Sequence, residues 1–368
     1  MKIFTILSAS ISVFLATACG SSSDTLPITA DSIAEYSLVL VDSFGVENGD
    51  SVNMIGSITS MCYHPNGSLL LLDNAAGCLR IIPENGEPFR ALRIGSGPGE
   101  FQGAQGVCAL GDGRILITDY MKLNLMTYDE HANYLGEYFP SSESDPPPEL
   151  WAVDSSSIIG VDGDNLMLDG ELVTYYYCAR YDSSIEPTVY YYLLNIDEIE
   201  HNELIRMLDV IEFHADRNGQ VYIIEDFTEY IIKIFNPDGS LAYEIAAQVD
   251  RLEKSEEQIL TEIEEYESFA VIDRGYAGGY QPSQYKRLVS IAGVDEDGFL
   301  WVERFDFDTG YHFDIWDDKG QLAYRAVLPE MVRHLEISFL VDEIGMVAAV
   351  TDPDDFPRIY FLKKDNIQ

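Results

Sequence analysis

Acidic residues recur where short apolar segments of this chain end. They are Asp73, Asp119, Asp162, Glu225, Glu303 and Asp352. If equivalent strands of a repeat place these carboxylates on one face, they can form a ring that holds a hard cation such as calcium. The alternative is that each acid accepts backbone N–H groups of its own loop and faces water. We take Asp73, Asp119, Glu225 and Glu303 as candidate ligand-binding residues and possible cation ligands, with calcium as the candidate cofactor.

His214 is a second candidate ligand-binding residue. It lies five residues before the turn glycine Gly219, and Cys62 and Cys108 hold the same place before their own turn glycines. The shared position predicts innermost strands, so we expect His214 near a central channel. A core histidine with satisfied hydrogen bonds is the alternative. The sequence contains no nucleophile motif such as G-x-S-x-G, and we assign no catalytic residue.

The segments around these residues have the pattern of antiparallel β-strands. In residues 213–245, four short apolar runs are separated by turns that contain Asn-Gly and Asp-Gly. This pattern predicts a four-stranded meander. Asp295-Glu296-Asp297-Gly298 resembles the start of a calcium loop, but no Glu stands at its twelfth position, and we interpret it as a hairpin turn.

The meander repeats along the chain. Gly67 and Gly113 are 46 residues apart, and Gly298 and Gly345 are 47 apart. A period in the forties with four strands per unit is typical of a propeller blade. Six units have the first three strands but only five have a fourth, and the isolated strand at 36–42 supplies the sixth. We therefore predict an all-β, six-bladed β-propeller of four-stranded antiparallel blades over residues 35–364, with the N-terminal strand closing the last blade.

One short helical insertion interrupts the repeat at about residues 248–285. Ser255 to Gln258 has the pattern of a capping box, and apolar residues follow at helical spacing with Glu between them. We expect one amphipathic helix packed on a blade. A helix that binds a partner is the alternative.

The N-terminus has the features of an export signal. Ile3–Leu15 is an apolar run too short to span a bilayer, and Leu15 to Gly20 (LATACG) resembles a bacterial lipobox. The resemblance implies a lipoprotein signal peptide at 1–19, lipidation of Cys19 and a flexible tether at 20–34. Because glycine rather than aspartate follows the cysteine, the resemblance implies anchoring to the bacterial outer membrane, on its periplasmic or surface side.

Charge limits the choice of partners. Lys and Arg number 22 against 63 Asp and Glu, a formal net charge of −41. Such a surface repels phosphate backbones, so nucleic acid is excluded as a partner. We expect a monomer that contacts the membrane only through its lipid and binds an envelope protein or a small ligand. Four further cysteines, Cys62, Cys78, Cys108 and Cys178, permit two disulfides or act as small buried apolar residues.

Several motifs resemble those of the bacterial six-bladed, NHL-like β-propeller lipoproteins. They are the linker GSGPGEF at Gly95 to Phe101, the D-x-x-G turns beginning at Asp216 and Asp295, and strands that end in Asp73 and Asp119. This resemblance implies a scaffold more than a reaction. The expected function is a ligand- or protein-binding scaffold anchored in the cell envelope. The alternative is a metal-dependent hydrolase or lactonase at the propeller channel.

Overall fold

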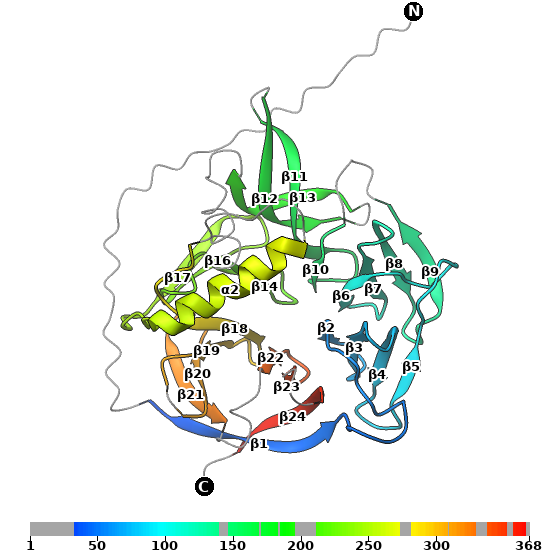
Figure 1. Ribbon diagram of the computed structural model, residues 1–368, viewed down its shortest axis with the longest axis horizontal. Coiled ribbons are helices and arrows are strands. Elements are labelled where there is room, and N and C mark those ends of the chain that lie inside the picture. The colour runs from blue at the N-terminus through cyan, green and yellow to red at the C-terminus, as the bar shows by residue number, and fades with distance from the viewer. Residues whose placement is uncertain are drawn as a thin grey trace, which may run out of the picture.

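The computed structural model describes residues 33–139, 146–168, 171–182, 185–195, 211–272, 281–307, 309–328, 337–351 and 356–365. These residues form a ring of β-sheets around a central opening, with one helix (Figure 1). The predicted signal peptide, Cys19 and Asp352 lie outside the described residues, as does nearly all of the predicted tether.

Four separate antiparallel sheets occupy more than half of the ring, and each has its strands in sequence order. The first contains β2 (Ser60–Tyr63), β3 (Leu69–Asp73), β4 (Cys78–Ile82) and β5 (Phe89–Ala91), and the second contains β6 (Ala104–Ala109), β7 (Ile115–Asp119), β8 (Asn124–Tyr128) and β9 (Tyr134–Tyr138). The third contains β10 (Glu149–Ala152), β11 (Ile158–Leu168), β12 (Glu171–Tyr181) and β13 (Pro187–Asn195), and the fourth contains β14 (Glu212–Ala215), β15 (Val221–Ile224), β16 (Ile231–Phe235) and β17 (Leu241–Ala246).

The other strands form one closed, eight-stranded sheet. Its members are β1 (Glu35–Phe44), β18 (Val289–Val294), β19 (Leu300–Arg304), β20 (Tyr311–Trp316), β21 (Leu322–Leu328), β22 (Ile337–Val341), β23 (Met346–Val350) and β24 (Arg358–Asp365). β18 to β21 and β22 to β24 are antiparallel runs, and β1 pairs antiparallel with β24 from Ser37↔Asp365 to Phe44↔Ile359. The predicted pairing of the two chain ends is confirmed.

The prediction of six separate sheets needs correction, because two parallel pairings join the runs of the closed sheet. At one edge, β1 extends beyond β24 and pairs with β21 from Glu35↔Arg325 to Ser37↔Val327. At the other, Gly293 pairs with Val341. A Cβ at Gly293 would lie 1.9 Å from the Val341 carbonyl oxygen, so this contact requires glycine. The repeat spacing carries no signal for either pairing.

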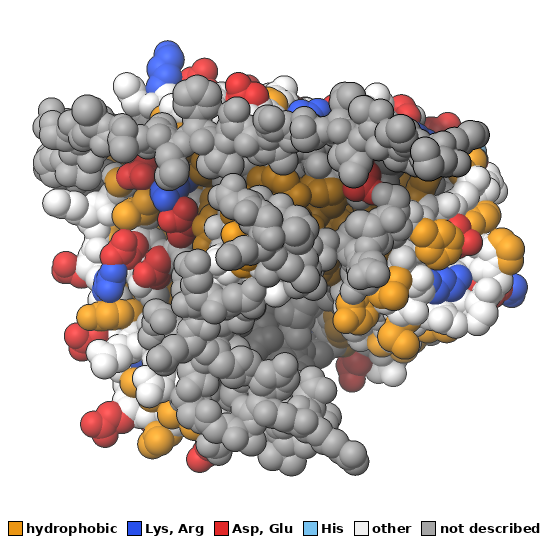
Figure 2. Space-filling view, turned by 90° about the horizontal axis from the view of Figure 1, so that it is seen from above, with side chains coloured by type: hydrophobic (Ala, Val, Ile, Leu, Met, Phe, Trp, Pro, Cys, Tyr) orange, Lys and Arg blue, Asp and Glu red, His pale blue; other side chains and the backbone are white. Residues whose placement is uncertain are grey.

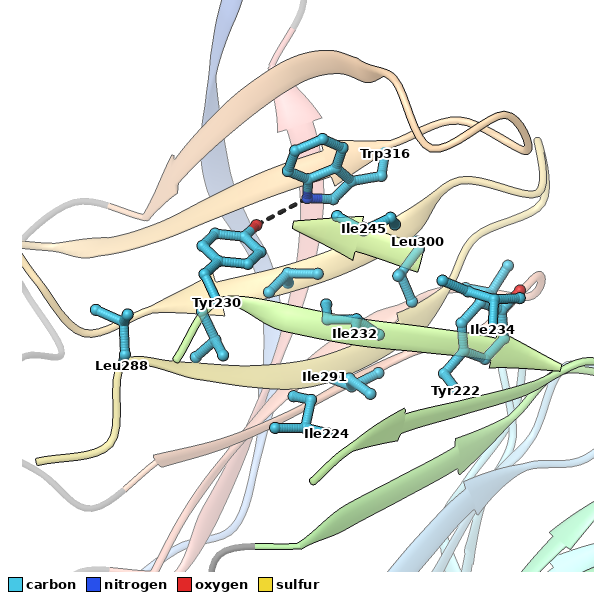
Figure 3. Packing of buried hydrophobic residues seen from close by; sticks show 13 residues of the cluster. Tyr222, Ile224, Tyr230, Ile232, Ile234, Ile245, Leu288, Ile291, Leu300 and Trp316 are labelled. Carbon is cyan, nitrogen blue, oxygen red and sulfur yellow. Dashed lines mark hydrogen bonds between the residues drawn. The ribbon is translucent and has the colours of Figure 1, made fainter. Parts of the chain in front are cut away.

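Neighbouring sheets pack face to face, and side chains from both form each core. Figure 3 shows one such core, in which residues of β15 to β17 meet residues of β18 to β20. The Trp316 indole N–H donates to the Tyr230 hydroxyl at 2.8 Å, and that hydroxyl donates to Asp314 at 3.1 Å. The aromatic residues thus fill the interface while their polar atoms remain hydrogen-bonded.

The D-x-x-G motifs form hairpin turns. The Asp295 carboxylate accepts the backbone N–H groups of Asp297 and Phe299 at 3.1 and 3.0 Å, and Gly298 has φ of +78°. Asp216 makes the same two contacts in its own turn, with Asn218 and Gln220. Aspartate therefore satisfies the turn backbone while glycine adopts the left-handed conformation. The interpretation of residues 295–298 as a turn is confirmed.

The GSGPGEF linker is a tight turn in which a side chain folds back over the glycines. The Glu100 carboxylate accepts the Gly97 N–H at 2.9 Å and pairs with Arg93. A Cβ at Gly95 would lie 2.0 Å from a Glu100 carboxylate oxygen. Ile94 and Phe101 pair across the turn. The glycines thus make room for Glu100.

The predicted insertion contains α2 (Glu256–Ile272), which crosses one face of the ring in the view of Figure 1. The capping box is confirmed: Ser255 Oγ accepts the Gln258 N–H at 3.2 Å, and the Gln258 side chain accepts the Ser255 N–H at 3.0 Å. Backbone bonds from Lys254 to Gln284 and from Lys286 to Leu252 close the base of the insertion. Within the described residues, the structure contains no helix long and apolar enough to cross a membrane.

Candidate functional site

The first strands of the antiparallel runs surround a central cavity of about 450 Å³. They are β2, β6, β10, β14, β18 and β22, and they bring segments from the whole ring to one site. The lining combines carboxylates, one guanidinium, two thiols and several aromatic rings. Its volume lies within the range of about 300–1,000 Å³ that is usual for small-molecule sites. This cavity is the candidate functional site.

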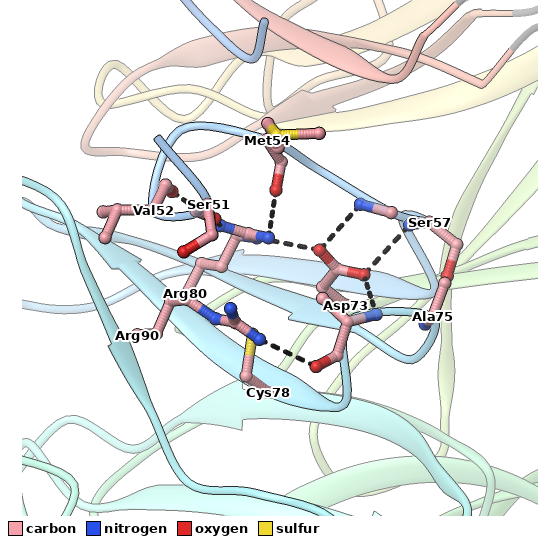
Figure 4. A network of polar contacts seen from close by, with 11 residues as sticks. Ser51, Val52, Met54, Ser57, Asp73, Ala75, Cys78, Arg80 and Arg90 are labelled. Atoms are coloured by element: carbon pink, nitrogen blue, oxygen red, sulfur yellow. Dashed lines mark hydrogen bonds and ion pairs between the residues drawn. The ribbon is translucent and has the colours of Figure 1, made fainter. Parts of the chain in front are cut away.

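Asp73 holds loop backbone and an arginine (Figure 4), and it is not among the residues that line the cavity. Its buried carboxylate accepts Arg80 Nε at 2.8 Å and the N–H groups of Gly56, Ser57 and Ala76 at 2.9–3.0 Å. Burial by itself raises the pKa of Asp73, but these hydrogen bonds outweigh it, and the pKa lies below its usual value. Asp73 thus binds loop backbone as in the alternative, but it is buried rather than facing water.

Asp119 occupies the equivalent place in the next sheet and has an equivalent role. Its buried carboxylate accepts the N–H groups of Gln102, Gly103 and Met121 at 2.7, 3.0 and 3.1 Å. The two aspartates therefore use the same geometry to hold the segment before the first strand of their sheet. The repeat in the sequence reflects this repeated structural contact.

Glu225 and Glu303 have different surroundings from the aspartates and from each other. Glu225 is exposed and pairs with Lys233 at 2.6 Å. Glu303 is buried, with 6% of its surface exposed, and no hydrogen bond to its carboxylate is present within the described residues. Burial raises the pKa of Glu303 to about 8, the charge of Glu212 adds to this rise, and Arg287 opposes it. The four predicted carboxylates thus have separate environments.

In the described part of the chain, no group of three or more His, Cys, Asp or Glu residues could hold a metal ion. The oxygens of Asp73 and Asp119 already accept hydrogen bonds from protein donors. A calcium ion could reach them only after those donors were displaced.

We expect added calcium to leave the melting temperature unchanged, because binding at these aspartates would break contacts that hold the loops. Differential scanning calorimetry with calcium, with chelator and with magnesium as the ionic control measures this. A saturable increase of several degrees with calcium alone would contradict the expectation and restore the cation hypothesis.

His214 lines the cavity, where its place in the repeat predicts it. Its ring lies edge to face with Trp151, at 6.2 Å between centroids, and 6.3 Å from the ring of Tyr222. Burial lowers the pKa of His214 to about 4, so the imidazole is neutral near pH 7. A neutral imidazole can donate and accept a hydrogen bond at the cavity wall.

Two glutamates that line the cavity, Glu149 and Glu212, are not among the site residues predicted from the sequence. Glu212 accepts Arg287 Nη1 at 2.7 Å, Ser290 Oγ at 3.0 Å and the Ile291 N–H at 2.8 Å. Burial nevertheless raises its pKa against these contacts. Burial also raises the pKa of Glu149, and the charge of Glu212 adds to that rise.

Strand boundaries explain this omission. The apolar runs begin at Leu150 and Phe213, one residue after the two glutamates, so the apolar pattern alone places both glutamates in loops. The alternation of side chains along a strand could have identified them. It places Glu149 on the same side of its strand as Trp151, and Glu212 on the same side as His214.

Arg217 crosses one end of the cavity. From the turn after β14, it donates to the Tyr63 carbonyl at 3.1 Å and to Asp342 at 3.4 Å, and it pairs with Glu343 at 3.0 Å. These residues lie on β2 and on the turn after β22. Arg217 therefore ties three parts of the ring together at its centre.

The cysteines in the described residues, Cys62, Cys78, Cys108 and Cys178, are free. Cys62 and Cys108 both line the cavity from adjacent first strands, as their equal spacing predicts. Burial raises the pKa of both thiols, that of Cys108 to about 12. Of the two alternatives for these cysteines, the structure shows small apolar side chains and contains no disulfide among them.

Comparison with solved structures shows a propeller-like fold. A predicted exported protein from Bacteroides fragilis is 12% identical, with 91% of this chain and 100% of that chain covered and a TM-score of 0.55. A member of the DUF4221 family from Bacteroides vulgatus is 12% identical, with 90% and 98% covered and a TM-score of 0.54. A gluconolactonase from Xanthomonas campestris, at 12% identity, 88% and 99% coverage and a TM-score of 0.46, is too distant to bear on activity. No family model and no curated protein matches the chain.

Proposed function

We propose that this protein is an exported, lipid-anchored, six-bladed propeller that binds a small ligand in its central cavity. The cavity carries this proposal, because it has the size of a ligand site and collects polar and aromatic side chains from every sheet. The closed eight-stranded sheet supports six blades, since it consists of two antiparallel four-stranded runs joined only at their edges.

Two observations support the proposed location at the outer membrane. LATACG resembles a lipobox, and a predicted exported protein shares the fold. Lipidation at Cys19 would hold the ring at the outer membrane, and the segment up to β1 would act as the tether. The acidic side chains on the face that Figure 2 shows suit a protein that stays soluble beside a membrane.

Filling the cavity tests the proposed function. Ala152 lines the cavity and is half-buried at the edge of the core that contains Leu150, so Ala152→Phe narrows the site, and a thermal melt checks that the variant still folds. We expect the wild-type protein, incubated with a small-molecule extract of the cell envelope, to retain a compound that mass spectrometry detects after denaturation. Ala152→Phe should not retain it.

The control is a matched substitution away from the cavity, Ala242→Phe on exposed β17. Equal retention by wild type and both variants would overturn the cavity as the binding site. Turnover of a lactone probe that Ala152→Phe abolishes and Ala242→Phe preserves would replace the binding function with the hydrolase alternative.

A further inference from the structure

One wall of the cavity presents a regular pattern of polar and aromatic side chains. β10 and β14 are neighbouring first strands (Figure 1), and residues of both line the cavity. Its polar and aromatic lining residues are Glu149 and Trp151 on β10 and Glu212 and His214 on β14, and the Trp151 ring also packs against the core that contains Phe213. The two carboxylates thus lie toward one end of the cavity, with the two rings next to them.

This wall carries more negative charge than its surroundings neutralise. Glu212 is bound by Arg287, Ser290 and a backbone N–H. No hydrogen bond or ion pair to the Glu149 carboxylate is present within the described residues, and the charge of Glu212 acts on it. The buried Glu303 lies behind Glu212 and also feels its charge. With its pKa at about 8, Glu303 is largely protonated near pH 7, so within the described residues Arg287 is the cation that Glu149 and Glu212 share on this wall.

The excess of acid extends around the whole cavity. Among the described lining residues, seven are acidic and one, Arg217, is basic, and the neutral His214 adds no charge. Arg217 is already paired with Asp342 and Glu343. Such a cavity repels anions and favours a ligand that brings positive charge to it.

The aromatic side chains distinguish an organic cation from a bare metal ion. The half-buried Trp151 ring lines the cavity beside Glu149, and aromatic faces attract ammonium groups and cover alkyl carbon. No set of ligands for a metal ion is present in the part of the chain that the structure describes. A cation with a carbon skeleton uses both the carboxylates and the ring.

We propose that the cavity binds a small organic cation, with its ammonium group at Glu149 and Glu212 and its carbon skeleton against Trp151. This inference rests on the proposed function and names its ligand class. Glu149 has no partner to lose in the described structure, so its carboxylate is free to pair with the ligand. Glu212 is held in place by β18 and supplies a fixed second charge.

Isothermal titration calorimetry with putrescine as the probe tests this inference. Butanediol has the same carbon chain without charge, and succinate has the opposite charge. We expect putrescine to bind, and the other two not to bind. Glu149→Gln should weaken putrescine binding by roughly tenfold, because it removes the charge of one of the two carboxylates that face the ammonium group.

Glu244→Gln is the matched control, because Glu244 lies exposed on β17 at the outer edge of its sheet. Its effect should stay within about twofold, which separates the cavity from the general acidity of the chain. Putrescine should also change tryptophan emission in the wild type and not in Trp151→Phe, since Trp301 and Trp316 are buried between sheets.

Three outcomes would overturn the inference. They are equal losses in Glu149→Gln and Glu244→Gln, equal binding of butanediol and putrescine, and binding of succinate in place of putrescine. Binding of succinate or butanediol that Ala152→Phe removes would leave the proposed cavity function standing while the ligand class fails. If Glu149→Gln does not fold, Trp151→Phe with putrescine decides the same question by calorimetry.

Discussion

Arg80→Met should destabilise the protein by about 3–5 kcal/mol, the usual result of removing one partner of a buried ion pair. The side chains of Arg80 and Asp73 are 2% and 0% exposed, and their atoms are 2.8 Å apart. Arg80 also donates to the carbonyl groups of Ser51, Val52 and Met54 (Figure 4). Methionine fills similar space but removes the donor to these oxygens and leaves the buried carboxylate without its counter-charge. Urea unfolding measures the loss.

Arg114→Met is the control for this prediction. Arg114 pairs with Asp112 at the same 2.8 Å, but the two side chains are 36% and 40% exposed. Exposed pairs contribute about 0–1 kcal/mol, so this variant should unfold close to the wild type. Equal losses in Arg80→Met and Arg114→Met would show that burial of the Asp73 pair does not matter, contrary to the structure.

Glu303→Gln should make the protein more stable in mild alkali and have little effect in mild acid. The pKa of Glu303 rises from 4.5 to about 8 in the folded state, chiefly through burial. The folded protein therefore binds this proton more tightly than the unfolded chain, and its stability falls as pH rises from about 5 to about 8. At 1.36 kcal/mol per pKa unit, the loss is on the order of 3–5 kcal/mol. Glutamine remains uncharged and avoids it.

Unfolding free energies of wild type and Glu303→Gln across this pH range check the sign and the size. Burial also raises the pKa values of Glu149 and Glu212, so the variant should retain a smaller slope of the same sign. Glu225→Gln changes an exposed carboxylate and should follow the wild type. If Glu303→Gln is less stable than wild type above about pH 8, the carboxylate has a stabilising partner and the prediction is wrong.

The repeat of the fold could be predicted from the sequence because the features that indicate it are local. Alternation of apolar residues, Asn-Gly and Asp-Gly turns and the spacing of turn glycines each depend on a few neighbouring residues. They sufficed for the strands of residues 213–245, the capping box at Ser255 and the pairing of the N-terminal strand with β24. The same local periodicity placed Cys62, Cys108 and His214 on cavity-lining strands.

The functional site was harder to predict from the sequence, because equivalent positions in a repeat need not share a function. Asp73 and Asp119 look like members of a carboxylate ring, but each binds the backbone of its own sheet. Glu303 holds a similar place in the sequence and lies buried, without such contacts in the described structure. Sequence spacing cannot tell these environments apart, since the donors belong to segments 16 or 17 residues away.

The sequence by itself determined the strand pattern, the turn chemistry and the acidic character of this protein. Only the tertiary structure decided that β1 joins both β24 and β21, that Gly293 meets Val341, and that Glu149 and Glu212 share a cavity wall with Trp151 and His214. The reason is physical: strand formation depends on local periodicity, whereas the charge and burial of a site depend on which distant strands the ring brings together.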